Sequence, residues 1–453
     1  MKLLVHSAAS PSSIEQQLGM ADYSYFFVKN LFLPVLARLG EVIDISDPAQ
    51  EVDAIYARAC AAGEFCLFFS FTPPHKTLTD LRCPSVCVFA WEYGTLPSEA
   101  WGDEPRNDWR YVLGRHGYAI THSAFAAATV RAALRQDFPV LSLPAPLWDA
   151  LQGLRQPPSS PLQRRYQLSL TASVIDSRTF ALEEVSEADL PAFVDELLAR
   201  AGQPRATVLD LEGVVYTAVF NPNDGRKNWF DLLSAFCWAL REREDAILLI
   251  KLSYRDLALS VHMLFVELRK LAPFRCRVVL IHGFLSEEAY QGLIQVSHYA
   301  VNSSHGEGQC LPLMEFMSAG KPAIAPDHTA MADYLDSDNA FVVASNREWT
   351  HWPHDPRALK RTFRYRIDWQ SLHDAYQQSY VVAREDDVRY QHMSEAAVES
   401  LRAHCSQQVI HASLAAFIAQ RHASHAAFTQ DTRARAWNWQ RWLCWLRWLR
   451  KWL

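Results

Sequence analysis

Short apolar runs alternate with longer helical patterns through the first 150 residues of the chain. The runs that we expect to form strands are residues 3–5, 54–56, 65–69, 86–90 and 118–121. Helical patterns lie between them, for example at residues 25–39 and 124–134. Buried strands separated by helices are typical of βαβ units. The pattern therefore predicts a mostly parallel, buried sheet in this part of the chain.

A second region of the same kind begins after residue 210. Its expected strands are residues 214–220, 246–250, 278–281, 299–301 and 323–325, with a helix at 231–240. Two such regions predict an α/β protein with two facing Rossmann-like domains, whose ligands bind at the carboxyl ends of the strands. The cleft between two domains is then the expected active site.

Proline spacing and composition divide the chain further. Five prolines between residues 144 and 161 mark a boundary with linker character. We expect a first domain at residues 1–150, a linker and insertion at 151–209, a second domain at 210–385, terminal helices that cross back at 386–428, and a tail at 429–453. Within the insertion, residues 165–205 have no assigned role and contain one acidic helix near 188–201.

Composition excludes several classes of protein. The 453 residues are 49% hydrophobic and 21% charged, which is typical of a soluble globular protein. No apolar run approaches the roughly 20 residues of a membrane-spanning helix. The nine cysteines lack metal-ligand or disulfide spacing, and we interpret them as reduced thiols in a cytoplasmic protein. A net charge of −6 argues against nucleic acid as a partner.

Two glutamates eight residues apart, Glu307 and Glu315, carry the strongest chemical signal. A polar, glycine-containing loop follows the apolar run 299–301, and a helix is expected to start near Leu311 and Pro312, since proline favours the first turn. Free N–H groups at a helix start suit anions and hydroxyl-rich ligands. Glu315, about one turn further on, is placed to accept hydrogen bonds from a diol.

Three cations follow strands of the second domain. Arg226 and Lys227 lie in the loop that precedes the helix 231–240, and Lys251 ends the strand 246–250. Point charges, the forked guanidinium and backbone N–H groups together suit a diphosphate. We therefore expect all three side chains to bind one.

The stretch from Ser303 to Pro322 resembles the Glu-x7-Glu signature of retaining, nucleotide-sugar-dependent glycosyltransferases of the family 4 type. The shared features are Ser303–Ser304, Glu307–Gly308, Leu311–Pro312 and the run Ala-Gly-Lys-Pro at 319–322. The resemblance extends to the loop 220–229, although Asn221 replaces the arginine of a Gly-Arg pair. It is strong over residues 210–340, weaker over 1–150, and absent from 150–205 and beyond 425. It implies a GT-B fold with two facing Rossmann-like domains.

The resemblance also implies roles for individual residues. Glu307 would bind hydroxyls of the donor sugar and Glu315 the nucleotide ribose. The backbone of Gly308, Gln309, Cys310 and Leu311 would lie close to the sugar or the diphosphate, with Cys310 where relatives often have glycine. Charge stabilisation by Arg226, Lys227 and Lys251 would support front-face departure of the diphosphate with retention. No cofactor and no metal is expected, and the tripeptide Asp336-Ser337-Asp338 is interpreted as a turn.

The first domain offers several candidates for a catalytic base. Relatives often have a histidine after the strand that corresponds to 86–90, whereas this chain has Trp91 and Glu92. Glu92 is a candidate for binding acceptor hydroxyls or assisting proton transfer, with a surface acid as the alternative. His122, at the end of the strand 118–121, and His75 are further candidates; a capping or packed histidine is the alternative for His122. The sequence does not determine whether the first-domain base is Glu92, His122 or His75, or whether this domain provides no base. Asp333 is expected to have a structural, helix-related role.

The C-terminal tail combines tryptophan with basic residues. Six tryptophans lie between Trp437 and Leu453, and one helical face would carry most of them opposite Arg447, Arg450 and Lys451. This composition is typical of an amphipathic helix at a membrane interface. The alternative is a helix that buries its tryptophans on the protein itself.

Together these features predict a metal-independent, retaining hexosyltransferase peripheral to the inner face of the cytoplasmic membrane. Its donor would be a nucleotide sugar, with GDP-mannose or a GDP-deoxyhexose as a guess. Its acceptor would be a lipid-linked or growing cell-envelope glycan such as lipopolysaccharide. The alternatives are a catalytically silent glycan-binding or scaffold subunit of a polysaccharide assembly complex, and a GT-B nucleotide-sugar epimerase. The sequence does not specify the donor base, linkage or oligomeric state.

Overall fold

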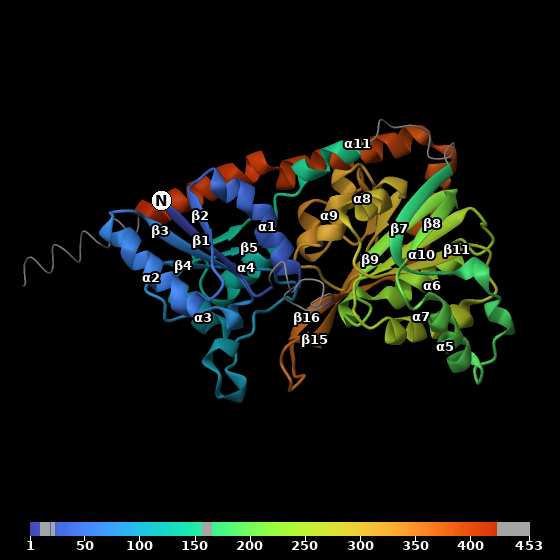
Figure 1. Cartoon of the computed structure of the whole chain (residues 1–453), viewed down its shortest axis with the longest axis horizontal. Helices are drawn as coiled ribbons and strands as arrows, with labels where there is room; N and C mark the ends of the chain where they lie inside the picture. The colour runs from blue at the N-terminus through green and yellow to red at the C-terminus, as the bar shows by residue number, and fades with distance from the viewer. Residues whose placement is uncertain (10–18, 20–22, 156–164, 424–453) are drawn as a thin grey trace, which may run out of the picture.

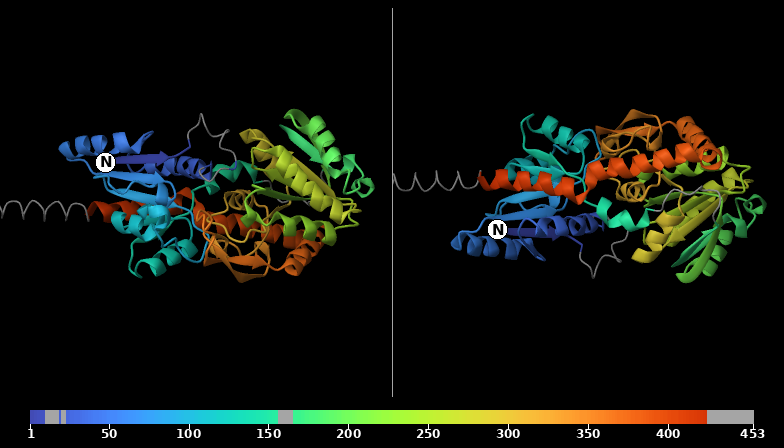
Figure 2. Two further views of the ribbon diagram at one scale, coloured as in Figure 1. Left: turned by 90° about the horizontal axis from the view of Figure 1, so that it is seen from below. Right: turned by 90° about the horizontal axis from the view of Figure 1, so that it is seen from above.

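The computed structural model describes residues 1–9, 19, 23–155 and 165–423. Two α/β bodies lie side by side, and helices near the C-terminus run along one edge of both (Figure 1). The two turned views in Figure 2 show the same helices spanning the pair of domains. The predicted amphipathic tail lies outside the described residues.

The first domain is built around a six-stranded parallel sheet with the order β2-β1-β3-β4-β5-β6. Its strands are β1 (Lys2–Ser7), β2 (Glu41–Asp44), β3 (Cys66–Phe71), β4 (Ser85–Phe89), β5 (Ala119–Thr121) and β6 (Val140–Ser142). The helices are α1 (Tyr23–Ala37), α2 (Pro48–Ala61), α3 (Trp109–His116) and α4 (Ala124–Ala133). The parallel sheet predicted from the alternating pattern is therefore confirmed.

One predicted strand is wrong. Residues 54–56 lie inside α2, which Asp47 caps by accepting a hydrogen bond from the Ala49 N–H and which begins at Pro48. Val52, Ile55 and Ala59 are the buried positions, and their spacing is helical. A run of three apolar residues is too short to distinguish the two periods. The sequence also missed β2, whose side chains are all at least partly exposed, and the three-residue β6.

The second domain contains an eight-stranded sheet with the order β14-β13-β12-β9-β10-β11-β7-β8. Its strands are β7 (Arg165–Asp176), β8 (Arg205–Glu212), β9 (Val214–Phe220), β10 (Ala246–Leu252), β11 (Arg277–His282), β12 (Tyr299–Val301), β13 (Ala323–Ala325) and β14 (Ala340–Val342). The helices are α5 (Leu190–Ala201), α6 (Trp229–Ala239), α7 (Leu257–Leu271), α8 (Glu287–Val296), α9 (Leu311–Ser318), α10 (Trp369–Glu385) and α11 (Asp387–Cys405). The strands and helices predicted for this domain are confirmed.

Residues 165–212 extend the second sheet. β7 pairs antiparallel with β11, and β8 pairs antiparallel with β7 at the sheet edge. Helix α5 between them contributes Leu190 and Val194 to the core of the second domain. The segment to which the sequence assigned no role is thus part of a sheet, joined to it by hydrogen bonds between residues distant in sequence.

Two features connect the domains. The helical residues 407–423 place Ile410, Leu414 and Phe417 in the core of the first domain. The second feature is a hairpin of β15 (Ser345–His351) and β16 (Lys360–Ile367), which the sequence did not predict. The Gly94 N–H donates to the Phe363 carbonyl at 3.1 Å, so this second-domain hairpin contacts a first-domain loop.

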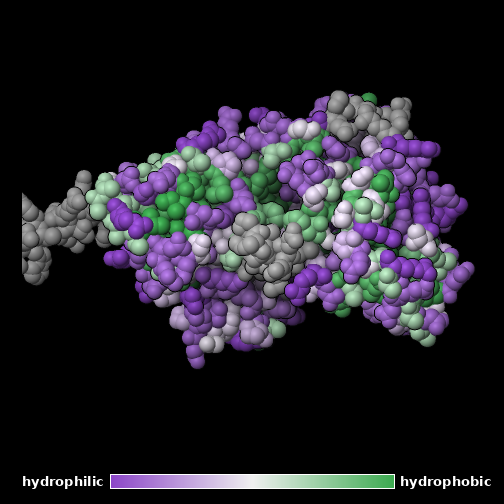
Figure 3. All heavy atoms as spheres, in the orientation of Figure 1, coloured by the Kyte–Doolittle hydropathy of each residue, from purple (hydrophilic) through white to green (hydrophobic). Residues whose placement is uncertain are grey.

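The face seen in Figure 3 is mostly covered by hydrophilic residues, with hydrophobic ones gathered over part of the first domain. Among the described helices, none combines the length and the apolar character that a membrane span requires. Every described cysteine is a free thiol, and Cys60 alone of these is exposed.

Candidate active site

The loop between β12 and α9 holds Glu307 at the start of a helix. Cys310 is the residue before α9, and its φ of 64° lies in the left-handed region. Glycine adopts this conformation without strain, whereas a side chain at the position costs free energy. The backbone geometry therefore favours glycine at this position and makes Cys310 a strained residue beside Glu307.

Glu307 is ionised and fully paired. Its Oε1 accepts from Lys227 Nζ at 2.7 Å, from the Ser304 hydroxyl at 2.6 Å and from the Asn302 amide at 3.1 Å. Its Oε2 lies 2.9 Å from Lys227 Nζ. The residue is only 3% exposed. Burial opposes ionisation, but the charges of Lys227 and Arg226 outweigh it and hold the pKa of Glu307 at about 2.

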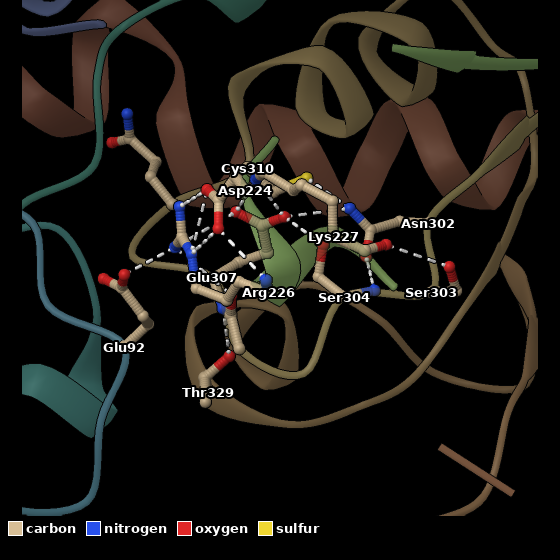
Figure 4. Close-up of polar contacts among 12 residues, drawn as sticks. Glu92, Asp224, Arg226, Lys227, Asn302, Ser303, Ser304, Glu307, Cys310 and Thr329 are labelled. Atoms are coloured by element: carbon tan, nitrogen blue, oxygen red, sulfur yellow. Dashed lines mark hydrogen bonds and ion pairs between the residues drawn. The ribbon is translucent and has the colours of Figure 1, made fainter. Parts of the chain in front are cut away.

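Arg226 joins the two domains at this point. One guanidinium nitrogen lies 2.6 Å from Glu92 Oε1 of the first domain and 4.0 Å from Glu307 Oε2; the other terminal nitrogen lies 2.8 Å from Asp224 Oδ2. Figure 4 shows Glu92 reaching from the first-domain loop toward Arg226, with the Glu307 network on the other side. Burial raises the pKa of Glu92, although Arg226 opposes the shift. The pKa of Asp224 is about 2, because Arg226 and Lys227 outweigh its burial.

Two glycines let the domains approach at this contact. A Cβ atom on Gly308 would lie 2.7 Å from the Ala90 Cβ, and one on Gly306 would lie 3.0 Å from the Glu92 carbonyl oxygen. The distance of 2.7 Å at Gly308 is shorter than real Cβ atoms show, so only glycine fits there without a shift of its neighbours. The loop after β4 therefore lies directly on the loop that carries Glu307.

Glu315 lies within α9 and has a separate environment. Its Oε2 accepts from the Tyr290 hydroxyl of α8 at 2.6 Å. Burial raises the pKa of Glu315 to about 7, with the Tyr290 hydrogen bond opposing the shift. The charge of Glu315 also helps burial to raise the pKa of Tyr23, at the start of α1, to about 12. This carboxyl group therefore exchanges its proton near neutral pH, unlike Glu307.

Lys251 is placed at the end of β10, as predicted, but its hydrogen bond goes to Ser253 rather than to the Glu307 network. Its Nζ lies 3.1 Å from the Ser253 hydroxyl, and the residue is 5% exposed. Burial lowers its pKa to about 8. The structure thus brings Arg226 and Lys227 to Glu307, whereas Lys251 has no direct contact with that network among the described residues.

The two first-domain histidines are packed side chains. His122 Nδ1 bonds to the Leu143 carbonyl at 2.9 Å, and burial lowers its pKa to about 4. His75 stacks on His354, with ring centroids 4.7 Å apart, and on Trp109, with ring centroids 5.9 Å apart. Of the three candidates for a first-domain base, the structure brings only Glu92 into contact with the charged network.

Gln309 forms another contact between the domains. Its Oε1 accepts from the Ala145 N–H at 2.6 Å, while its Nε2 has no partner among the described atoms although it is buried. The chain enters α9 through Gly308, Gln309 and Cys310, and Leu311 is the first residue of the helix, as the sequence predicts. Their proposed proximity to a donor remains a prediction.

Several residues of the network were not predicted. Asn302, Ser304 and Asp224 each bond to a predicted residue, and Thr329 accepts from the Glu307 N–H at 3.0 Å. Ser304 belongs to the signature and Asn302 adjoins it, so their polarity at a strand end was an available signal. Thr329 lies 22 residues further along the chain, and no local pattern indicates its contact.

The acidic residues after Thr329 are structural. Asp333 accepts from the Ala124 N–H at 2.8 Å and so binds the first turn of α4 across the domain boundary. Asp336 accepts from the Asp338 N–H at 2.9 Å and forms the predicted turn. Within the part of the chain that the structure describes, no group of three His, Cys, Asp or Glu side chains is arranged as metal ligands would be.

Comparisons with known proteins support the fold and find a family match within the second domain. Residues 213–355 match the family model described as "Glycosyl transferases group 1". No curated protein sequence matches the chain. A sucrose-phosphate synthase from Thermosynechococcus elongatus has a similar structure, with a TM-score of 0.53 and 14% identity over 93% of this chain and 99% of that one. HepE from Anabaena, solved with UDP and glucose, has a TM-score of 0.52 and 12% identity over 92% and 99%.

A longer protein also has some likeness. The chain spans 54% of the length of TarM from S. aureus, with a TM-score of 0.46 and 10% identity over 77% of this chain. Identities this low establish only the fold, while the family match falls on the domain that holds both signature glutamates. The chain therefore has the GT-B fold, and the residues of its second domain from 213 to 355 match the family model of group 1 glycosyltransferases.

Proposed function

We propose that the chain transfers a hexose, with retention, from a nucleoside diphosphate sugar to a glycan acceptor. The observation that supports this most is the pairing of Glu307 with Lys227 and Arg226 at the start of α9, inside the family-matched segment. A carboxylate held ionised beside two cations can accept hydrogen bonds from sugar hydroxyls. The cations then lie beside the position where a diphosphate would leave.

In the proposed reaction, Lys227 and Arg226 stabilise the charge that develops on the departing diphosphate. Fixed charges in a site that excludes water stabilise such a transition state more strongly than mobile ones in water. Glu92 and Asp224 already neutralise part of Arg226, so a diphosphate would compete with Glu92 for the guanidinium. Lys251, with its pKa of about 8, is a further cation for the same group in the proposal. The proposed chemistry uses these cations in place of a metal and requires no cofactor.

Glu315 is proposed to bind the nucleotide ribose, with Tyr290 orienting its carboxyl group. As the donor we propose GDP-mannose or a GDP-deoxyhexose. The Anabaena neighbour, in contrast, was solved with UDP and glucose, so UDP-sugars are equally important to test. Of the first-domain residues, Glu92 is our candidate for contact with the acceptor, because it alone of the three predicted candidates meets the charged network.

The acceptor is proposed to be a lipid-linked or growing cell-envelope glycan at the inner face of the cytoplasmic membrane. The support is the sequence of residues 437–453, in which tryptophans alternate with arginine and lysine. Each cation near an anionic leaflet contributes on the order of 1 kcal/mol. A chain truncated before Trp437 should therefore bind anionic vesicles less than the full-length chain; equal binding would contradict this part of the proposal.

A thermal-shift panel of UDP-, GDP-, ADP- and dTDP-sugars tests the donor site. One nucleotide class should raise the melting temperature of the wild type, and Glu315→Ala should abolish the shift. Glu288→Ala, which changes an exposed glutamate of the neighbouring α8, should retain it and serves as the matched control. If no nucleotide sugar stabilises the wild type, the transferase proposal fails.

A further inference from the structure

The hairpin β15–β16 has a chemistry unlike the rest of the chain. Residues 345–367 contain six Lys or Arg and two acids, whereas the whole chain has a net charge of −6. Trp349 of this hairpin is 67% exposed, which is unusual for the largest apolar side chain. An exposed tryptophan in a basic segment of an acidic protein indicates a binding surface on the hairpin.

The base of the hairpin, where β16 ends, lies beside the candidate active site. The Tyr365 N–H donates to the His305 carbonyl at 2.8 Å, and the His305 ring bonds to the Tyr365 carbonyl at 2.9 Å. His305 lies two residues before Glu307 in the sequence. The Tyr365 ring stacks on His328 at 4.6 Å, and His328 adjoins Thr329, the acceptor for the Glu307 N–H. The strand β16 is thus fixed to the loop that carries Glu307.

Three aromatic side chains and one arginine lie on one face of the hairpin. Trp349 lies opposite Phe363, and Arg347 lies opposite Tyr365, and residues opposite each other in an antiparallel pair share a face. The Phe363 and Tyr365 rings are 6.1 Å apart, and the Arg347 guanidinium lies 4.7 Å from the Phe363 centroid. We name this set, Arg347, Trp349, Phe363 and Tyr365, the aromatic face. It leads from the loop of Glu307 outward to the exposed Trp349.

The charges on the hairpin are only partly neutralised. Arg364 pairs with Glu348, while Arg357 and Arg361 pair with Glu99 of the first domain. Arg347 and Lys360 form no salt bridge within the described residues, whereas Arg366 adds to the positive charge that Arg364 places beside Glu348. Arg347 and Lys360 are exposed and available to an anionic ligand, and Arg347 lies on the aromatic face itself.

We propose that the aromatic face binds the acceptor, and that the acceptor is a glycan bearing carboxylate or phosphate groups. Sugar rings have C–H faces that pack on aromatic rings, and anionic substituents complement the unpaired cations. The proposal rests on the proposed transferase function, since it places the acceptor beside Glu307. It adds the chemical class of the acceptor, and it assigns a binding role to the second domain.

Binding of tetragalacturonate, with neutral maltotetraose as the comparison, tests the proposal by calorimetry at low salt. The full-length wild type should bind tetragalacturonate more tightly than maltotetraose. Trp349→Ala and Arg347→Gln should each weaken tetragalacturonate binding about tenfold. A poly(glycerol phosphate) oligomer, tested in parallel, distinguishes phosphate from carboxylate as the preferred group.

The chain provides a matched control on the same domain. Trp238 of α6 is 54% exposed, and Arg241 lies 5.0 Å from its ring centroid. Trp238→Ala and Arg241→Gln should leave tetragalacturonate binding unchanged. The thermal shift produced by the donor nucleotide should persist in Trp349→Ala, which separates failure of this proposal from failure of the donor site.

Three results would overturn the inference. In the first, the wild type binds neither anionic oligomer. In the second, all four variants bind like the wild type or lose affinity equally. In the third, Trp349→Ala leaves oligomer binding intact but weakens binding to phosphatidylglycerol vesicles, which would make the hairpin a membrane-contact element.

Discussion

Two of the contacts between the domains differ in chemical character, one being charged and the other aromatic. At the first, Arg226 lies 2.6 Å from Glu92 and also forms ion pairs with Asp224 and Glu307. At the second, Trp352 from the hairpin is 1% exposed and belongs to the core of the first domain. We name the first the charged contact and the second the aromatic contact.

The aromatic contact is a cluster of rings from both domains. Trp352 stacks on Trp101 at 6.0 Å, and the His354 ring lies 5.3 Å from Trp109 and 4.7 Å from His75. Burial of large rings contributes several kcal/mol and depends little on ionisation. Burying an ion pair costs about as much desolvation free energy as its attraction returns. The aromatic contact therefore contributes more than the charged contact to holding the domains together.

The largest expected effect on stability is at the aromatic contact. Trp352→Ala should lower the free energy of unfolding by about 3–5 kcal/mol, because it leaves a cavity among buried rings. Urea denaturation measures this change. Trp349→Ala in the same strand pair is the control, since its exposed ring should contribute less than about 0.5 kcal/mol. Equal losses in the two variants would mean that the buried ring does not join the domains.

Glu307→Gln should affect catalysis more than stability or nucleotide binding. The amide keeps the size of the side chain but removes the charge that pairs with Lys227. The transfer rate from the stabilising donor should fall about 10²-fold, the range seen for loss of one electrostatic contact in an active site. Glu288→Gln on α8 should react like the wild type. A transfer rate within about threefold of wild type in Glu307→Gln would assign the charged contact a structural role.

Glu315 gives a smaller effect with a defined pH dependence. Its pKa in the folded chain, about 7, exceeds the ordinary value of 4.5. The folded state then binds more protons than the unfolded state between these values, so stability from this group is complete below pH 4.5 and is lost as the pH rises through 7. Glu315→Gln should remove that loss, and its stability relative to wild type should increase by roughly 1–3 kcal/mol between pH 5 and pH 8.

Urea unfolding at the two pH values measures the change. Glu288→Gln should show a constant difference from wild type, because no buried carboxyl group is altered. A constant difference in Glu315→Gln as well would contradict the raised pKa of Glu315.

The sequence predicts the parts of the molecule that local patterns determine. Strands such as β9 and β10 are continuous apolar runs, and Glu307 and Glu315 fall in a signature with helix-start residues between them. The hairpin β15–β16 was missed, since its alternating positions carry arginine and tryptophan instead of a clear apolar face. Its Trp352 is buried by contact with the first domain, which no local pattern indicates.

Contacts between the domains could not be predicted for the same reason. Glu92 was a candidate for acceptor chemistry, but nothing near it in sequence indicates that it pairs with Arg226, 134 residues away. Lys251 was grouped with Arg226 because both follow strands of one sheet. In the structure the two side chains have different partners. Lys251 bonds to Ser253, whereas Arg226 pairs with Glu92.

The central claim is that the charged contact binds the diphosphate of a nucleotide sugar. Calorimetric titration with the nucleoside diphosphate of the stabilising donor and with its monophosphate, on wild type and on Lys227→Ala, tests it most directly. The wild type should prefer the diphosphate at least about tenfold, as expected for a second charged phosphate among cations, and Lys227→Ala should reduce that preference toward one. Equal affinities in the wild type, or an unchanged preference in the variant, would contradict the account.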